Sequence, residues 1–87
     1  MINEEYLRAD GFNKAIIGID MVNQKVIYDK LKMIEILVED DGMTEEDAIE
    51  YLAYNVWSAY VGEFTPIYMD DVNSDYLDHL QENYKNI

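Results

Sequence analysis

The first third of the chain alternates apolar and polar residues with the period of two that β-strands require. Residues 14–19 place three apolar side chains on one side, so this stretch predicts a strand whose buried face consists of Ala15, Ile17 and Ile19. A second β-rich run occupies residues 25–29, after a polar reversal at residues 20–24. Together the two runs predict a hairpin with a longer loop. Residues 4–8, which precede them, are predicted to form a short helix that ends in a turn.

After the hairpin, the apolar residues recur at helical spacing. One helix is predicted over residues 30–41, with an apolar face made of Leu31, Met33, Ile34, Leu37 and Val38. Gly42 suits the left-handed position in which many helices end. A second helix is predicted from Thr44, which forms an imperfect capping box with Asp47, to Gly62. Its continuous apolar stripe consists of Ile49, Leu52, Ala53, Val56, Trp57 and Tyr60.

The last third of the chain predicts one more strand and one more helix. Pro66 excludes helix and leads into a short strand at residues 67–69, a position that suits the edge of a sheet. A turn at residues 70–73 precedes a final helix with an apolar face made of Tyr76, Leu77, Leu80 and Tyr84. The order short α-β-β-α-α-β-α predicts an α+β fold in which helices pack on a small, three-stranded, mostly antiparallel sheet. Residues 1–87 are too few for a second core, so we expect a single compact domain.

Charge is distributed very unevenly along the sequence. Residues 33–84 contain fourteen Asp and Glu but no Lys or Arg, whereas residues 1–32 are balanced, and the net charge is −13. Small domains usually carry a net charge of roughly 2–8, because excess charge of one sign destabilises the compact state. Asp40 and Asp41 also oppose the dipole of the first predicted helix. Such breaks of a local rule point to function rather than folding.

The same charge excludes some partners and locations. Direct binding to nucleic acid or to an anionic membrane requires Lys and Arg, so neither is expected. No stretch has the roughly 18 apolar residues of a membrane span. The N-terminus has neither the basic region nor the apolar run of a signal peptide, and the chain contains no cysteine. We therefore expect a cytoplasmic protein.

Residues typical of catalysis and metal binding are sparse. The single histidine, His79, lies on the polar side of the predicted final helix and forms no motif with Ser58 or Ser74. The glycines are too scattered to form a phosphate-binding loop. The acidic run before Gly42 fails the test for a calcium-binding EF-hand, because counting back puts Leu37 at position 1, where a carboxylate is needed. We expect no catalytic residue, no metal site and no cofactor.

A binding function is the better interpretation of the acidic residues. Rows of carboxylates can imitate duplex DNA, which carries one charge per roughly 1.7 Å of axis. Tyr51 and Tyr54 fall opposite the apolar stripe of the second predicted helix, and tyrosine is enriched at interfaces. The alternatives are that these tyrosines pack against a neighbouring element and that the acids form a solvated face. The predicted partner-binding residues are Glu39, Asp40, Asp41, Glu46, Asp47, Glu50, Tyr51 and Tyr54.

One extended segment also carries a resemblance. It reads Glu45-Glu46-Asp47-Ala48-Ile49-Glu50-Tyr51-Leu52-Ala53-Tyr54-Asn55, continued by Ala59-Tyr60-Val61-Gly62-Glu63 and Thr65-Pro66-Ile67, with Ala15-Ile16-Ile17-Gly18 and Val26-Ile27-Tyr28-Asp29 upstream. This pattern resembles small acidic proteins of bacteriophages and related mobile elements over residues 14–69. The resemblance transfers no catalytic residues and implies an accessory protein in a host cytoplasm, where such proteins often block host enzymes, including restriction and CRISPR machinery. The chain departs from the pattern at Trp57, where a smaller residue is expected.

Three hypotheses follow. The first is a small acidic, non-enzymatic binding protein that inhibits a basic, nucleic-acid-processing host protein by imitating DNA, an anti-restriction or anti-CRISPR role. The second is a homo-oligomeric structural or assembly protein, such as a homodimer, with a symmetric interface formed by Tyr51, Tyr54 and Trp57. The third is a carboxylate-based metal enzyme.

Overall fold

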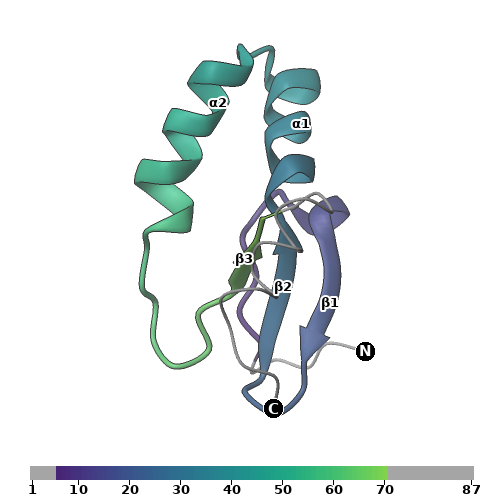
Figure 1. Cartoon of the computed structure of the whole chain (residues 1–87), viewed down its shortest axis with the longest axis vertical. Coiled ribbons are helices and arrows are strands. Elements are labelled where there is room, and N and C mark those ends of the chain that lie inside the picture. Colours follow the sequence, from purple (N-terminus) through teal and green to yellow (C-terminus); the bar gives the residue numbers. More distant parts are fainter. Residues whose placement is uncertain (1–5, 71–87) are drawn as a thin grey trace, which may run out of the picture.

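The computed structural model describes residues 6–70, which form an α+β fold with a three-stranded sheet and two α-helices (Figure 1). The sequence-based prediction of this fold class is confirmed, and the predicted final helix lies outside the described residues. No helix in the described part is long and apolar enough to cross a membrane. In chain order the elements are η1 (Asn13–Ala15), β1 (Ile16–Asp20), β2 (Lys25–Asp29), α1 (Lys30–Asp41), α2 (Glu45–Leu52), η2 (Ala53–Trp57) and β3 (Ile67–Met69).

The sheet is mixed rather than mostly antiparallel as predicted, with strand order β1-β2-β3. β1 and β2 form the predicted antiparallel hairpin, whereas β3 runs parallel to β2. The helices between β2 and β3 make the parallel pairing possible, because a parallel neighbour requires a long crossover connection. β3 lies at the edge of the sheet, as Pro66 indicated, and Pro66 itself is buried.

The hairpin between β1 and β2 is closed by Asp20. Its carboxylate accepts hydrogen bonds from the backbone N–H groups of Val22 (3.1 Å) and Asn23 (3.2 Å) and from Nδ2 of Asn23 (2.9 Å). The Asn23 side chain is the main reason that the pKa of Asp20 is lowered. Because the pKa is lowered on folding, this contribution to stability is present above the ordinary pKa and is lost as the pH falls through the folded value.

A β-bulge changes the face that β1 presents to the core. Ile16 pairs with Tyr28, but Gly18 already pairs with Ile27, so the register shifts between Ile16 and Gly18. The prediction that Ile17 is buried is therefore wrong, since its side chain is 47% exposed. The strand also starts later than predicted, because residues 14–15 belong to η1.

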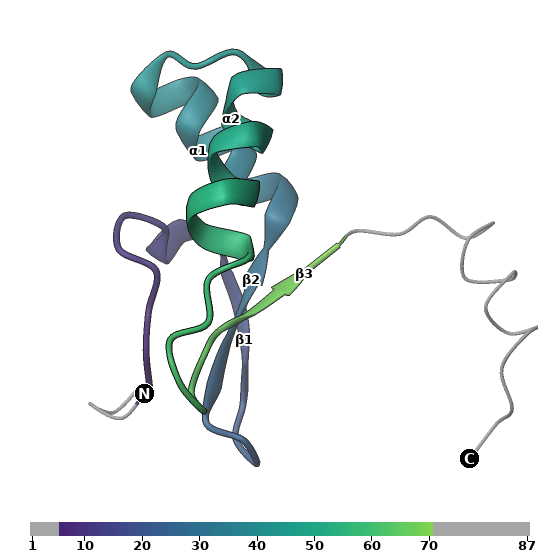
Figure 2. The same ribbon diagram turned by 90° about the vertical axis from the view of Figure 1, so that its left-hand side faces the viewer.

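The two α-helices extend the sheet lengthwise. β2 passes into α1 without a loop, and α1 and α2 form a helical hairpin beyond the end of the strands (Figures 1 and 2). The core is continuous across these layers, because every element places at least one apolar side chain in or against it, including Ile16 of β1 and Tyr68 of β3. Its buried residues are Phe12, Ala15, Val26, Tyr28, Met33, Leu37, Ala48 and Leu52.

The segment before η1 packs against the sheet instead of forming the predicted helix. Residues 6–8 are not helical, and the N–H of Ala9 donates to the hydroxyl of Tyr28 (2.7 Å). Helices this short are marginal without tertiary support. Tyr28 is fully buried and its ring stacks on Tyr68 of β3, with ring centroids 5.6 Å apart. Through these two contacts, Tyr28 joins the first segment to the edge strand β3.

We expect the protein to lose stability at alkaline pH because of these two tyrosines. Burial raises the pKa of Tyr28 and Tyr68 above the ordinary value of 10.0. The neutral form therefore contributes stability that is fully present below pH 10.0 and is lost as the pH rises through the raised values. Denaturant unfolding across this range, with tyrosinate absorbance recorded in parallel, measures the effect. A Tyr68→Phe variant should lose less stability, and an unfolding free energy that does not change above pH 10.0 contradicts the prediction.

The second helix ends earlier than the sequence indicated. α2 continues into η2, a π-helical segment, and the chain leaves the helical conformation after Trp57 rather than at Gly62. Because a π turn takes up more residues than an α turn, the side chains after Leu52 rotate relative to the α-helical stripe. Tyr60, predicted on the apolar stripe, is 80% exposed, and Ile49 is 40% exposed.

Candidate functional site

The predicted acidic residues of α1 lie at the exposed C-terminal end of that helix. Gly42 has a left-handed conformation (φ 71°) and donates its N–H to the carbonyl of Leu37, so the predicted cap is confirmed. Asp40 and Asp41 occupy the last turn, which contains no basic residue, and both side chains are exposed. Glu39 is also exposed. These carboxylates lie against the negative end of the helix dipole.

α2 begins with three more carboxylates. Thr44 is the N-cap, as predicted, and its Oγ1 accepts a hydrogen bond from the N–H of Asp47 (3.1 Å). Glu45, Glu46 and Asp47 fill the first turn, where the helix dipole favours negative charge. The two helix ends therefore place like charges side by side, but with opposite local effects on stability.

Matched substitutions at the two ends should change stability in opposite directions. We expect Asp41→Asn to stabilise the protein by about 0.3–1 kcal/mol and Glu46→Gln to destabilise it by a similar amount. Thermal and denaturant unfolding of both variants measure the difference. If both substitutions shift the unfolding free energy in the same direction, net charge rather than the helix dipole governs these positions.

Tyr51 lines two neighbouring hollows on the surface. Most of the predicted site residues line one or the other of them. The first, of about 320 Å3, is lined by Asp10, Gly11, Phe12, Ile36, Leu37, Asp40, Asp41, Met43 and Tyr51. The second, of about 360 Å3, is lined by Asp47, Glu50, Tyr51, Tyr54 and Asn55. We name the residues Asp40, Asp41, Asp47, Glu50, Tyr51 and Tyr54 the acidic face. Glu39 and Glu46 are exposed but line neither hollow.

Both tyrosines reach the surface of the molecule, Tyr54 more fully than Tyr51. Tyr51 is 44% exposed and Tyr54 is 79% exposed. Asn55 supports this part of the helix, because its Nδ2 donates to the carbonyl of Tyr51 (3.0 Å). A half-exposed tyrosine flanked by hollows offers both an apolar ring and a polar hydroxyl to a partner.

Asp10 is a site residue that the sequence did not indicate. The turn at Asp10 and Gly11 was predicted, and Gly11 has the positive φ of 88° that such a turn uses. Only the packing of the first segment against α1 brings Asp10 to the hollow with Asp40 and Asp41. This hollow therefore combines apolar residues with three carboxylates, a combination that suits the apolar stem and charged head of arginine or lysine.

Among residues 6–70, no base forms an ion pair with a carboxylate of the acidic face. Within residues 6–70 the structure contains one ion pair, between Lys30 and Asp70 (3.3 Å), and neither residue belongs to the acidic face. In the same range, no three His, Cys, Asp or Glu side chains come together in a way that could hold a metal ion. His79 and Ser74 lie outside the described part, and the hydroxyl of Ser58 donates to the carbonyl of Tyr54 (3.3 Å).

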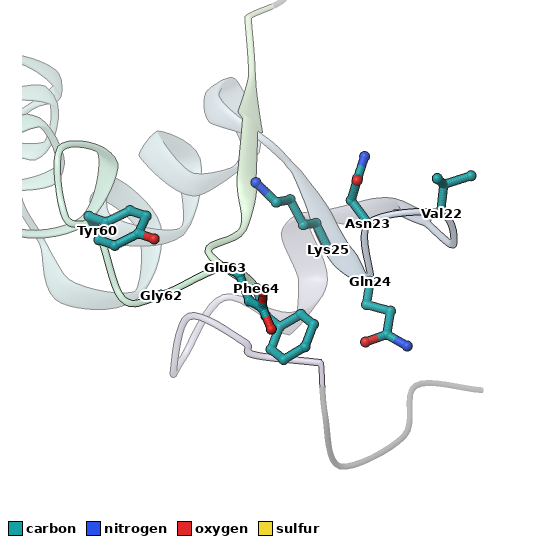
Figure 3. A pocket seen from close by; sticks show the side chains of 8 residues that line it. All are labelled: Val22, Asn23, Gln24, Lys25, Tyr60, Gly62, Glu63 and Phe64. Atoms are coloured by element: carbon teal, nitrogen blue, oxygen red, sulfur yellow. The ribbon is translucent and has the colours of Figure 1, made fainter.

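A larger hollow of about 650 Å3 lies elsewhere, between the hairpin tip and the loop after η2. Figure 3 shows its lining residues, with Tyr60 on one side and Val22 and Asn23 on the other. Its charged residues, Lys25 and Glu63, have opposite signs, and none of the predicted site residues lines it. It lacks the concentration of like charge that distinguishes the acidic face.

The segment that resembles bacteriophage proteins covers α2, η2 and the loop into β3, so it includes four of the six residues of the acidic face, Asp47, Glu50, Tyr51 and Tyr54. The resemblance stays a prediction, and charge and geometry are what support a function for this chain. Comparisons with protein-family models, with curated proteins and with solved structures found no match.

Proposed function

We propose that this protein is a non-enzymatic inhibitor that binds a basic, nucleic-acid-processing host protein through the acidic face. The observation that carries the proposal is the arrangement around Tyr51, where carboxylates from two helices surround one half-exposed tyrosine. Such a role fits a bacteriophage accessory protein directed against restriction or CRISPR machinery.

The energetic argument rests on uncompensated charge. Carboxylates of like sign on neighbouring helix ends repel one another, and the effect extends over the roughly 8–10 Å Debye length at ordinary ionic strength. A basic partner would replace this repulsion with attraction, and it would also be steered towards the acidic face during the encounter. The negative charge therefore destabilises the free protein and stabilises the complex with a basic partner.

The shape of the surface supports the same class of partner. A protein that binds duplex DNA presents Lys and Arg side chains, and the hollow lined by Asp10, Asp40 and Asp41 has the apolar residues and carboxylates that such side chains need. The neighbouring hollow is also acidic, because Asp47 and Glu50 line it beside the two tyrosines. Two adjacent hollows therefore offer a basic surface two groups of carboxylates that share Tyr51.

The assembly hypothesis receives less support from this geometry. It requires Tyr51, Tyr54 and Trp57 in one interface, but Trp57 lines a different hollow, together with Lys30. A two-fold symmetric contact through Tyr51 would also bring the acidic face of one copy close to that of the other. Like charges in such a contact oppose association.

The test is an affinity capture of the tagged protein from bacterial lysate at low and at moderate salt, with mass spectrometry of the bound proteins. We expect one stoichiometric, basic nucleic-acid-handling partner whose recovery falls as salt rises. Added duplex DNA should displace it, because both ligands would use the same basic surface. Recovery of this protein alone at both salts overturns the proposal, and a partner that DNA fails to displace overturns the mimicry.

A further inference from the structure

A second, apolar groove lies between α1 and α2, distinct from the acidic face. It has a volume of about 240 Å3 and is lined by Lys30, Leu31, Ile34, Ile49, Trp57 and Asp70. Leu31 is 49% exposed, and Val38, two turns further along the same side of α1, is 36% exposed. Large apolar side chains thus form a stripe on the outside of the helical hairpin. A stripe of this kind usually marks a surface that another segment covers.

Asp70, which follows β3 in the chain, lines this groove. The carboxylate of Asp70, the last described residue, lies 3.3 Å from the ammonium of Lys30. That ammonium also lies over the ring of Trp57, 4.7 Å from the centroid, and Trp57 Nε1 contacts Sδ of Met33 at 3.5 Å. Lys30 therefore holds Asp70, which follows β3 directly, beside the apolar stripe.

The sequence that follows Asp70 has the complementary pattern. At 100° per residue, Tyr76, Leu77, Leu80 and Tyr84 fall on one side of a helix, whereas Asp75, Asp78 and Glu82 fall on the other. Tyr76 and Tyr84 would span about 12 Å along a helix axis, close to the roughly 10 Å between Leu31 and Val38 on α1. The length and the polarity of this segment both match the groove.

We propose that residues 74–84 bind intramolecularly in the groove between α1 and α2 as an amphipathic helix. The apolar side covers Leu31, Ile34 and Ile49, and the acidic side faces outward. This contact is independent of the acidic face, so either proposal can fail without the other.

The first test uses Trp57, the only tryptophan of the chain, as a reporter of the groove. In the full chain, we expect Leu77→Ser with Leu80→Ser to shift the tryptophan emission to the red and to increase its quenching by acrylamide. The control variant, Asp78→Asn with Glu82→Gln, changes the outward side and should leave both readings unchanged. Unchanged emission and quenching in the leucine variant overturn the proposal.

The second test leaves the apolar side intact, in case the leucine variant does not fold. Because the chain contains no cysteine, Glu82→Cys accepts a single nitroxide spin label. We expect the label to broaden the NMR signals of Val38 and Ile49 but not those of Met21 and Val22 at the hairpin tip. Absence of broadening at the groove overturns the proposal. Broadening between a spin-labelled and a separate isotope-labelled copy also overturns it, because the occupant is then a second molecule.

Discussion

The variant in which Asp40, Asp41, Glu46 and Asp47 are all changed to lysine is expected to lose its partner. Each reversal replaces an attraction to a basic surface with a repulsion, and like charges across an interface cost several kcal/mol. We expect a loss of at least about 3 kcal/mol, roughly a hundredfold in Kd. Titration calorimetry or surface plasmon resonance with the captured partner measures it.

A matched pair of double variants separates position from net charge. Asp40→Lys with Asp47→Lys alters both hollows at Tyr51, whereas Glu35→Lys with Glu63→Lys makes the same change in charge at residues that line neither of them. The first pair should weaken binding strongly and the second only slightly, through long-range attraction. Equal losses would mean that total charge drives binding, and unchanged affinity in the four-lysine variant would refute the proposed function.

The second large effect concerns stability rather than binding. Leu52 is fully buried in α2 and belongs to the continuous core. We expect Leu52→Ala to lower the free energy of unfolding by about 2–5 kcal/mol, since it removes buried apolar area and leaves a cavity. This is a large part of the roughly 5–15 kcal/mol that stabilises most domains. Denaturant unfolding followed by circular dichroism measures the loss.

The same chemical change at Leu7 provides the control for Leu52. Leu7 is 37% exposed and is not part of the buried core, so Leu7→Ala should cost clearly less. If the two variants lose the same stability with unchanged denaturant slopes, the burial of Leu52 is not what stabilises α2.

Local elements were predictable because neighbouring residues determine them. Thr44 begins α2 by accepting a hydrogen bond from the N–H of Asp47, three residues further along the chain. Gly42 ends α1 because glycine adopts a left-handed conformation at little cost. The hairpin and the edge position of β3 also followed from alternation and from Pro66. The helix caps and the hairpin depend on contacts within a few residues along the chain, whereas the edge position of β3 was indicated by Pro66, which lacks a backbone N–H.

Features that depend on distant contacts were predicted wrongly or not at all. The bulge beside Ile17 and the π-helical segment after Leu52 change which side chains face the core, although simple periodicity placed Ile17 and Tyr60 inside. The segment around Ala9 packs against Tyr28 instead of forming a helix. Neither a bulge nor a π turn has a strong sequence signal, because both result from packing between elements.

The sequence by itself determined the composition of the candidate site: an acidic stretch without bases at residues 33–84, with two tyrosines opposite the apolar stripe. Only the tertiary structure decided how these residues are grouped. The tight turn between α1 and α2 brings Asp40 and Asp41 to the same side of the molecule as Tyr51, and the packing of the first segment adds Asp10. Charge is a property of the residues, whereas its concentration on one surface results from how the helices pack.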